Sequence, residues 1–248
     1  MKRKLGIIIQ ARTNSRRLPN KTLAQIDEKP LIIYLYERVK NHFDLPIIIA
    51  TTTNSKDDEM VSLLKSYNIN LFRGSEENVI DRFIETCYRF EITDIVRVCC
   101  DNPFLDLAYL EQLVNIWHCN GYSDYISFEF KNKPVILSHF GVFTEIVKLS
   151  ALENVVRIYP QNKKYFEHVT NGVYMNPQIF KIHLVNLDDE LSRYEGVRLT
   201  IDTKEDLFRI SNLTPLSKNK NFKEIAEYVL SQPHLFEGMK NTIKDQQK

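Results

Sequence analysis

The chain has 248 residues, of which 43% are hydrophobic and 26% charged, and its formal net charge is +1. This composition suits a globular α/β protein with a sizeable core, and the near-neutral charge gives no overall electrostatic signature of nucleic-acid binding. No apolar run approaches the roughly 18 residues of a membrane span, and the run near the N-terminus is too short for a signal peptide. We therefore expect a cytoplasmic protein that binds neither nucleic acid nor membranes.

A basic loop follows the first predicted strand. The run Ile7-Ile8-Ile9 is short and β-branched, as a buried strand would be, and the cations that follow it are Arg12, Arg16, Arg17 and Lys21. A charge cluster of this kind is often only a solvated loop. Its position favours a phosphate-binding loop, because ligands bind at the carboxyl ends of strands in open α/β sheets.

The loop matches neither a Walker A motif nor a Rossmann fingerprint, because it contains no glycine. Asn14 and Asn20 can still adopt left-handed backbone conformations, so tight turns remain available. Pro19 fixes its own φ beside Asn20 and stiffens the chain that presents Lys21.

Strands and helices then alternate at short intervals. The pattern predicts strands at residues 46–53, about 70–72 and 95–100. It predicts helices that begin at Pro30 and after residues 54–58, and others over residues 77–90 and about 107–119. This alternation implies a mostly parallel sheet built from βαβ units with right-handed crossovers.

The rhythm changes beyond Gly121, where polar turns join the strand-like pieces at about 124–130 and 135–142. We expect an antiparallel insertion at about 122–180 within a single domain at 1–240. Further helices are expected at about 144–154, 166–176 and 204–212, and a returning core strand at 197–202. The last residues, 241–248, have little apolar content, which predicts a frayed tail.

Two acidic residues end predicted strands. Asp101 should lie at the same sheet edge as the basic loop, and its carboxylate is a ligand type that Mg²⁺ prefers, although Asp-x-Pro also simply turns a chain. Asp202 ends the later strand, although it or Thr203 could instead cap the next helix. Arg97 lies on the strand that leads to Asp101, so it must pair with an acid or reach the cleft.

The spacing R-x-x-S-x-R-L-P-x-K, from Arg12 to Lys21, resembles the signature of the sugar-acid cytidylyltransferases. The resemblance is strongest to the spore-coat polysaccharide type and weaker to CMP-KDO and CMP-sialic acid synthetases. Glycine often stands in that family where this chain has Asn14 and Asn20. The resemblance implies a Rossmann-like, GT-A-like nucleotidyltransferase fold with a mostly parallel sheet and a small antiparallel insertion.

Later segments resemble the same family in the same order. The segment CCDNPFLD carries Asp101, and RLTIDTKEDL carries Asp202. A third segment begins with Arg73-Gly74-Ser75, in which Ser75 could equally be a helix cap. The pair Gly141 and Glu145 matches G-x-x-x-E, and residues 167–170 match E-H-V-T. Phe143 stands where relatives often carry an aspartate, so the identity of the acceptor transfers least well.

The resemblance implies a role for each matching residue, although His168 taken alone is an ordinary candidate for a hydrogen-bonded structural group. Catalysis is assigned to Arg12, Lys21 and Asp101. Nucleotide binding is assigned to Gln10, Ala11, Arg12, Ser15, Arg17, Lys21, Arg73 and Arg97. Acceptor binding is assigned to Asn78, Arg82, Glu145, His168 and Thr170. A bound Mg²⁺ is assigned to Asp101 and Asp202.

The function that we predict is transfer of CMP from CTP to an acidic sugar or related acceptor, with release of pyrophosphate, in the synthesis of surface polysaccharides or glycans. The alternatives are a nucleotide-sugar-dependent glycosyltransferase and a non-catalytic nucleotide-binding subunit. Related enzymes are commonly dimers, so we expect a homodimer. The aromatic residues between Tyr122 and Phe130 could form its interface or simply pack in the core.

Overall fold

One mixed sheet organises the computed structural model, which describes residues 3–119, 121–218 and 220–246. The strand order is β10-β7-β9-β6-β1-β4-β5, and β8 pairs with β7. The strands are β1 (Leu5–Gln10), β4 (Ile47–Thr52), β5 (Leu71–Gly74), β6 (Asp94–Cys99), β7 (Tyr125–Phe130), β8 (Lys133–Pro134), β9 (Glu145–Lys148) and β10 (Ile182–Asn186). A separate two-stranded antiparallel sheet joins β2 (Gln25–Ile26) to β3 (Lys29–Pro30).

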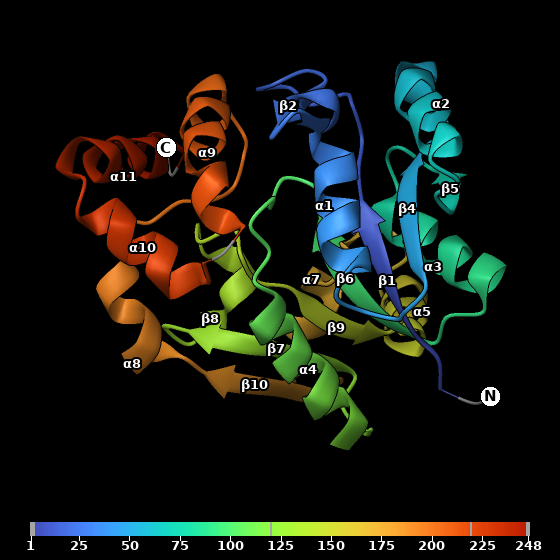
Figure 1. Cartoon of the computed structure of the whole chain (residues 1–248). Helices are drawn as coiled ribbons and strands as arrows, with labels where there is room; N and C mark the ends of the chain where they lie inside the picture. Colours follow the sequence, from blue (N-terminus) through green and yellow to red (C-terminus); the bar gives the residue numbers. More distant parts are fainter. Residues whose placement is uncertain (1–2, 120, 219, 247–248) are drawn as a thin grey trace.

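Helices lie on both faces of the main sheet and at one end of it (Figure 1). Those of the first half are α1 (Leu31–Lys40), α2 (Asp58–Ser66), α3 (Val79–Phe90) and α4 (Leu107–Cys119). Those of the second half are α5 (Leu149–Ile158), α6 (Lys163–Glu167), α7 (Asn171–Tyr174), α8 (Asp188–Leu191), α9 (Lys204–Ser217), α10 (Phe222–Leu230) and α11 (Pro233–Gln246).

Alternation along β1 separates two hydrophobic cores. Ile7 and Ile9 pack in one core with apolar residues of α1, α2 and α4, whereas Ile8 packs in the other with residues of α3, α5 and α7. Successive side chains of a strand point to opposite faces, so these two sets of helices cover opposite faces of the sheet. The predicted mostly parallel α/β sheet is confirmed.

The sheet aligns the strand ends that carry the site. Strand β1 is parallel to both β4 and β6, and Gln10 lies beside Ala50 and Cys99 in the register. The loops that leave β1, β4 and β6 therefore start at one edge of the sheet. This is the edge at which the basic loop was predicted to meet Asp101.

The second half of the chain contributes to the same sheet. Strand β9 lies between β6 and β7 and is antiparallel to both, while β10 is parallel to β7. The prediction of a strand at 135–142 is wrong. A two-residue turn with positive φ at Lys131 and Asn132 reverses the chain, so that the strand that pairs with the end of β7 is the short β8 at Lys133–Pro134. The helix predicted at 144–154 begins late, because residues 145–148 pair as β9.

Two further segments differ from prediction. Residues 197–202 are not a strand, because Leu199 donates to the Phe140 carbonyl and Ile201 to the Asp101 carbonyl, so no continuous ladder forms. The helix predicted at 166–176 is broken after α6, where His168 has an extended backbone.

The predicted tail is helical in its described part. Residues 241–246 continue α11, and Arg209 donates to the hydroxyl of Thr242 at 2.9 Å. Residues 247–248 lie outside the described part of the chain.

The aromatic residues near β7 mostly pack in the core. Tyr125, Phe128 and Phe130 are buried, whereas Tyr122 is 80% exposed. Core packing therefore accounts for the first three, and Tyr122 alone is available on the surface. Within the described ranges, no helix is both long and apolar enough to cross a membrane.

Candidate active site

Lys21 lies between the two acids that the sequence singled out. Its Nζ is 3.0 Å from Oδ2 of Asp101 and 3.2 Å from Oδ1 of Asp202, and it also donates to the Ile201 carbonyl at 3.0 Å. Asp101 follows β6, and Asp202 ends the extended segment that bonds to the Asp101 backbone. The predicted convergence of the basic loop with both acids is confirmed.

The charges of this cluster stabilise one another. Burial alone would lower the pKa of Lys21, but the carboxylates of Asp101 and Asp202 outweigh it and raise that pKa above its ordinary value. Burial likewise would raise the pKa of Asp202, but Lys21, Arg198 and Arg17 hold it below its ordinary value. Lys21 is therefore an ammonium and Asp202 a carboxylate at neutral pH.

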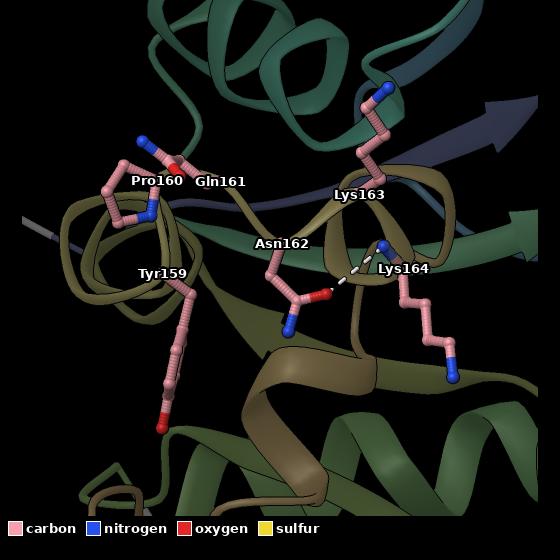
Figure 2. Close-up of a pocket in the computed structure, with 6 residues that line it drawn as sticks. All are labelled: Tyr159, Pro160, Gln161, Asn162, Lys163 and Lys164. Carbon is pink, nitrogen blue, oxygen red and sulfur yellow. Dashed lines mark hydrogen bonds between the residues drawn. The ribbon is translucent and has the colours of Figure 1, made fainter.

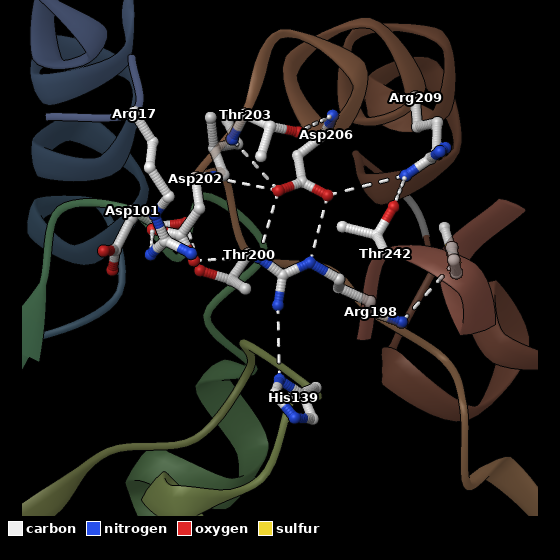
Figure 3. Close-up of polar contacts among 12 residues, drawn as sticks. Arg17, Asp101, His139, Arg198, Thr200, Asp202, Thr203, Asp206, Arg209 and Thr242 are labelled. Atoms are coloured by element: carbon white, nitrogen blue, oxygen red, sulfur yellow. Dashed lines mark hydrogen bonds and ion pairs between the residues drawn. The ribbon is translucent and has the colours of Figure 1, made fainter. Parts of the chain in front are cut away.

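Two arginines fix the carboxylate of Asp202 from other directions. Arg17 of the basic loop lies 3.1 Å from Oδ1, and Arg198 donates to Oδ2 at 2.8 Å. Arg198 is itself held by both carboxylate oxygens of Asp206, at 3.0 Å each (Figure 3). The planar guanidinium suits this two-pronged contact, so Asp202 has little rotational freedom.

The helix cap is Thr203 rather than Asp202. Thr203 accepts from the Asp206 amide at 3.1 Å, and Asp206 in turn accepts from the Thr203 amide, which completes a capping box. Capping by Thr203 leaves the Asp202 side chain to face Lys21.

Asp57 anchors the start of the basic loop. This buried carboxylate accepts from the Thr13 amide at 2.8 Å, from the Thr13 hydroxyl at 2.6 Å and from the Thr51 hydroxyl at 3.0 Å. It also accepts from the amide and hydroxyl of Thr52 at the end of β4. Burial favours a raised pKa, but these hydrogen bonds keep the pKa of Asp57 below its ordinary value.

Thr13 and Asn20 shape the rest of the loop. The Thr13 carbonyl accepts from the amides of Ser15 and Asn20 at 2.8 and 2.9 Å. Asn20 has a left-handed backbone, with φ of 58°, immediately before the short 3₁₀ turn that starts at Lys21. The prediction that asparagine would supply a tight turn is confirmed at this position.

The loop forms part of a cleft of about 1180 Å³ at the carboxyl ends of β1 and β6. Arg12, Arg16 and Arg17 are exposed there. The predicted site residues that line the cleft are Gln10, Ala11, Arg12, Ser15, Arg17, Lys21, Asn78, Asp101, His168 and Asp202. The structure therefore gathers most of the predicted set around one hollow.

A second group of predicted residues lies outside the cleft lining. Arg73 donates to the carbonyls of Thr52 and Asn54 and pairs with Asp58 at 2.7 Å, so it joins β5 to the start of α2. Arg82 is buried and donates to the Ser75 carbonyl at 2.6 Å. Neither residue lines the cleft, so the binding roles that the resemblance implies for them stay predictions.

The buried carboxylate of Glu145 is the centre of a cluster of polar side chains. It accepts from Arg97 at 2.7 Å, from Thr170 at 2.9 Å and from the Tyr125 hydroxyl. Arg97 also reaches the Gln10 side chain at 3.4 Å. The expectation that Arg97 pairs with an acid is confirmed, and the acid is its cross-strand neighbour on β9.

Sequence reasoning missed the supporting residues Asp57, Asp206 and Arg198. The first two looked like ordinary helix-start acids, and the third like any strand residue. The signal available for Asp57 and Asp206 was their position shortly after the predicted strands 46–53 and 197–202, where loops that bind ligands begin. Arg198 lies inside the predicted strand 197–202, where no such signal marks it.

A family model described as Cytidylyltransferase matches residues 6–239. The chain belongs to the cytidylyltransferase family. Two relatives of this cytidylyltransferase match over most of their length. An uncharacterised protein of Methanocaldococcus jannaschii is 38% identical over 200 residues, which cover 80% of this chain and 78% of the relative. The spore coat polysaccharide biosynthesis protein SpsF of Bacillus subtilis is 32% identical over 211 residues, which cover 83% and 84%.

Solved structures place this cytidylyltransferase in the same fold. A cytidylyltransferase from Leptospira borgpetersenii is 28% identical, covers 94% of this chain and 97% of its own, and has a TM-score of 0.82. A CMP:2-keto-3-deoxy-manno-octonic acid synthetase complexed with CTP is 16% identical, covers 86% and 99%, and has a TM-score of 0.66, which shows the fold. The predicted family and nucleotidyltransferase fold are confirmed.

Proposed function

We propose that this cytidylyltransferase transfers CMP from CTP to an acidic sugar or related acceptor and releases pyrophosphate. The observation that carries the proposal is the position of Lys21, whose Nζ lies 3.0 and 3.2 Å from carboxylate oxygens of Asp101 and Asp202. Exposed arginines lie beside it in a cleft of about 1180 Å³, which is large enough for two substrates. The comparisons support it, since the family is the cytidylyltransferases and the similar synthetase was solved with CTP.

In the proposed reaction an acceptor oxygen forms a bond to the α-phosphorus of CTP while the bond to the β-phosphate oxygen breaks. The acceptor proton leaves to solvent, and pyrophosphate carries away the electron pair. Arg12 and Arg17 suit bidentate contact with phosphate oxygens, and Lys21 supplies a compact positive charge. Catalysis then comes mainly from positioning and charge neutralisation rather than from a covalent intermediate.

The carboxylates of Asp101 and Asp202, which contact Lys21, are suitable ligands for a divalent cation. Both are hard oxygen donors that already stabilise a positive charge at a shared position. Among the described residues, no group of three or more His, Cys, Asp or Glu side chains could hold a metal, so phosphates and water would complete the shell. When bound, Mg²⁺ would polarise the reacting phosphate and offset its charge. Asp101 and Asp202 are the residues that would hold it.

The remaining parts of the proposal concern the setting of the enzyme. The similar SpsF protein takes part in spore coat polysaccharide biosynthesis by name, which supports a role in the synthesis of surface polysaccharide or glycan. A homodimer and a cytoplasmic location complete the proposal. Light scattering on the purified chain would test the dimer, and fractionation of the producing cells would test the location.

The test is pyrophosphate release from each of the four nucleoside triphosphates, with Mg²⁺ and a panel of sugar acids and polyol phosphates. We expect release that requires CTP, one acidic acceptor and Mg²⁺, and that stops when EDTA is added. Binding of CTP without turnover on any acceptor would support a non-catalytic subunit instead. Consumption of a nucleotide sugar without pyrophosphate would support a glycosyltransferase.

A further inference from the structure

The cleft is lined by two segments of different chemistry. The basic loop contributes four cations, Arg12, Arg16, Arg17 and Lys21. The second segment runs from Pro160 to His168 and includes α6. Of the described residues that line the cleft, Lys163 is the one lysine or arginine that does not come from the basic loop.

We propose that Lys163 binds the acidic group of the acceptor, which rests on the function proposed above. The cleft volume of about 1180 Å³ exceeds the roughly 300–1,000 Å³ of ordinary small-molecule pockets, so it has room for a second substrate. In the proposed function, the loop cations Arg12, Arg17 and Lys21 bind the triphosphate. A carboxylate or phosphate on the acceptor needs a separate cation, and Lys163 supplies it.

No ion pair uses the charge of Lys163 in the part of the chain that the structure describes. Its side chain is exposed, and within the described ranges no carboxylate lies within the 4.0 Å of an ion pair with it. Glu77 and Glu167 line the same cleft, but neither pairs with Lys163. The ammonium therefore remains available to an anion that enters the cleft.

The backbone that carries Lys163 is held in place before a ligand binds. The Tyr159 hydroxyl donates to Asn176 at 2.8 Å, and its ring packs edge-on to Tyr165 with centroids 5.1 Å apart. The Asn162 side chain accepts from the Lys164 amide at 3.2 Å and starts α6. A fixed backbone lowers the entropy that ordering the contact would otherwise cost.

The next residue provides a matched control. Figure 2 shows the Lys163 side chain extending toward the neighbouring helix and the Lys164 side chain extending the opposite way. Lys164 is also exposed, but it does not line the cleft. Both lysines belong to the same short helix and each carries one positive charge, so they differ chiefly in where the ammonium lies.

The experiment measures binding of acidic and uncharged probes to enzyme filled with a CTP analogue that has a methylene between the α- and β-phosphorus. The probes are 3-deoxy-manno-octulosonate and N-acetylneuraminate, each compared with its methyl ester by isothermal titration calorimetry. We expect wild type to prefer one acid over its ester by about tenfold or more, as loss of one charge-assisted contact predicts. K163A should lose this preference, whereas K163R and K164A should keep it.

Equal preference in K163A and wild type would overturn the assignment of Lys163, and so would an equal loss in K164A. The assignment also fails if wild type prefers no acid of the panel over its ester. Failure of the underlying function looks different, because wild type would then release no pyrophosphate from CTP with any acceptor, whether or not it binds the CTP analogue.

Discussion

The ammonium of Lys21 lies 3.2 Å from the carboxylate of Asp202, although 181 positions separate the two residues in the chain. The contact joins the loop after the first strand to the segment before α9, so the site exists only when the sheet is assembled. In the proposed function, it also places a positive charge beside the triphosphate of CTP.

Lys21→Ala should lower kcat by about 10²–10³-fold, the usual cost of removing one group that stabilises developing charge. The ammonium is expected to neutralise phosphate charge as the bond to pyrophosphate breaks. Pyrophosphate release at saturating CTP measures the effect, and K29A is the control because Lys29 lies in an exposed pair with Glu37. Turnover equal to wild type in folded K21A would contradict the role assigned to Lys21.

Much of this site could be predicted, because the ends of β-strands can be predicted from the sequence. The β-branched run before Arg12 and the apolar run before Asp101 each mark a parallel strand, and parallel strands bring their carboxyl ends to one edge. That reasoning placed Lys21 near Asp101 without any long-range information. It also required Arg97 to find a partner, and the partner is Glu145.

The parts that sequence could not give depend on tertiary contacts. Residues 197–202 alternate like a strand, yet their amides bond to single carbonyls of different segments rather than to a neighbouring strand. Asp57 looked like a helix-start residue, and its five donors come from Thr13, Thr51 and Thr52 only after β1 and β4 pair. Local propensity predicts neither fact, because it does not depend on which distant segments of the chain come into contact.

Asp57→Asn should destabilise the fold and weaken CTP binding together. The substitution keeps the size of the side chain but places an amide N–H₂ among donors from Thr13, Thr51 and Thr52. Leaving buried donors unsatisfied costs about 1–3 kcal/mol, and each kcal/mol lowers Tm by about 2–4 °C at this size. Thermal unfolding and CTP titration measure the two effects.

The matched control for Asp57 is its neighbour Asp58, which is exposed and pairs with Arg73 at the surface. D58N should change stability by less than about 1 kcal/mol and leave CTP affinity intact. A D57N variant that loses stability but binds CTP as wild type would show that Asp57 supports the fold without positioning the loop.

Glu145→Gln should act mainly on stability. Glu145 is fully buried and pairs with Arg97 at 2.7 Å, so the substitution leaves a guanidinium that is only 14% exposed without its counter-charge. Breaking one partner of a buried pair costs about 3–5 kcal/mol. Chemical denaturation measures it, with E37Q in the exposed Lys29 pair as the control. A small stability loss with a large rise in acceptor KM would instead support the acceptor-binding role that the resemblance implied.

Asp202→Asn should show a stability loss that depends on pH. The pKa of Asp202 is lowered in the folded protein despite burial, because Lys21, Arg198 and Arg17 favour its ionised form. A group with a lowered folded pKa adds stability above its unfolded pKa of about 3.9, and that stability disappears as the pH falls through the folded value. We expect the free energy of unfolding of wild type to exceed that of D202N by about 1–3 kcal/mol at pH 7.

The gap should stay level between about pH 7 and 5 and shrink below about pH 4, where the unfolded state binds the proton and the folded state does not yet bind it. Below the folded pKa both states bind the proton, and the charge of Asp202 no longer contributes to the gap. Lys21 does not interfere in this range, because its pKa is raised and its contribution is lost only in strong alkali. Urea unfolding across this range tests the trend, with D189N at an exposed position of α8 as the control. A gap that persists unchanged to pH 3 would mean that the charge of Asp202, and hence its hold on Lys21, does not stabilise the fold.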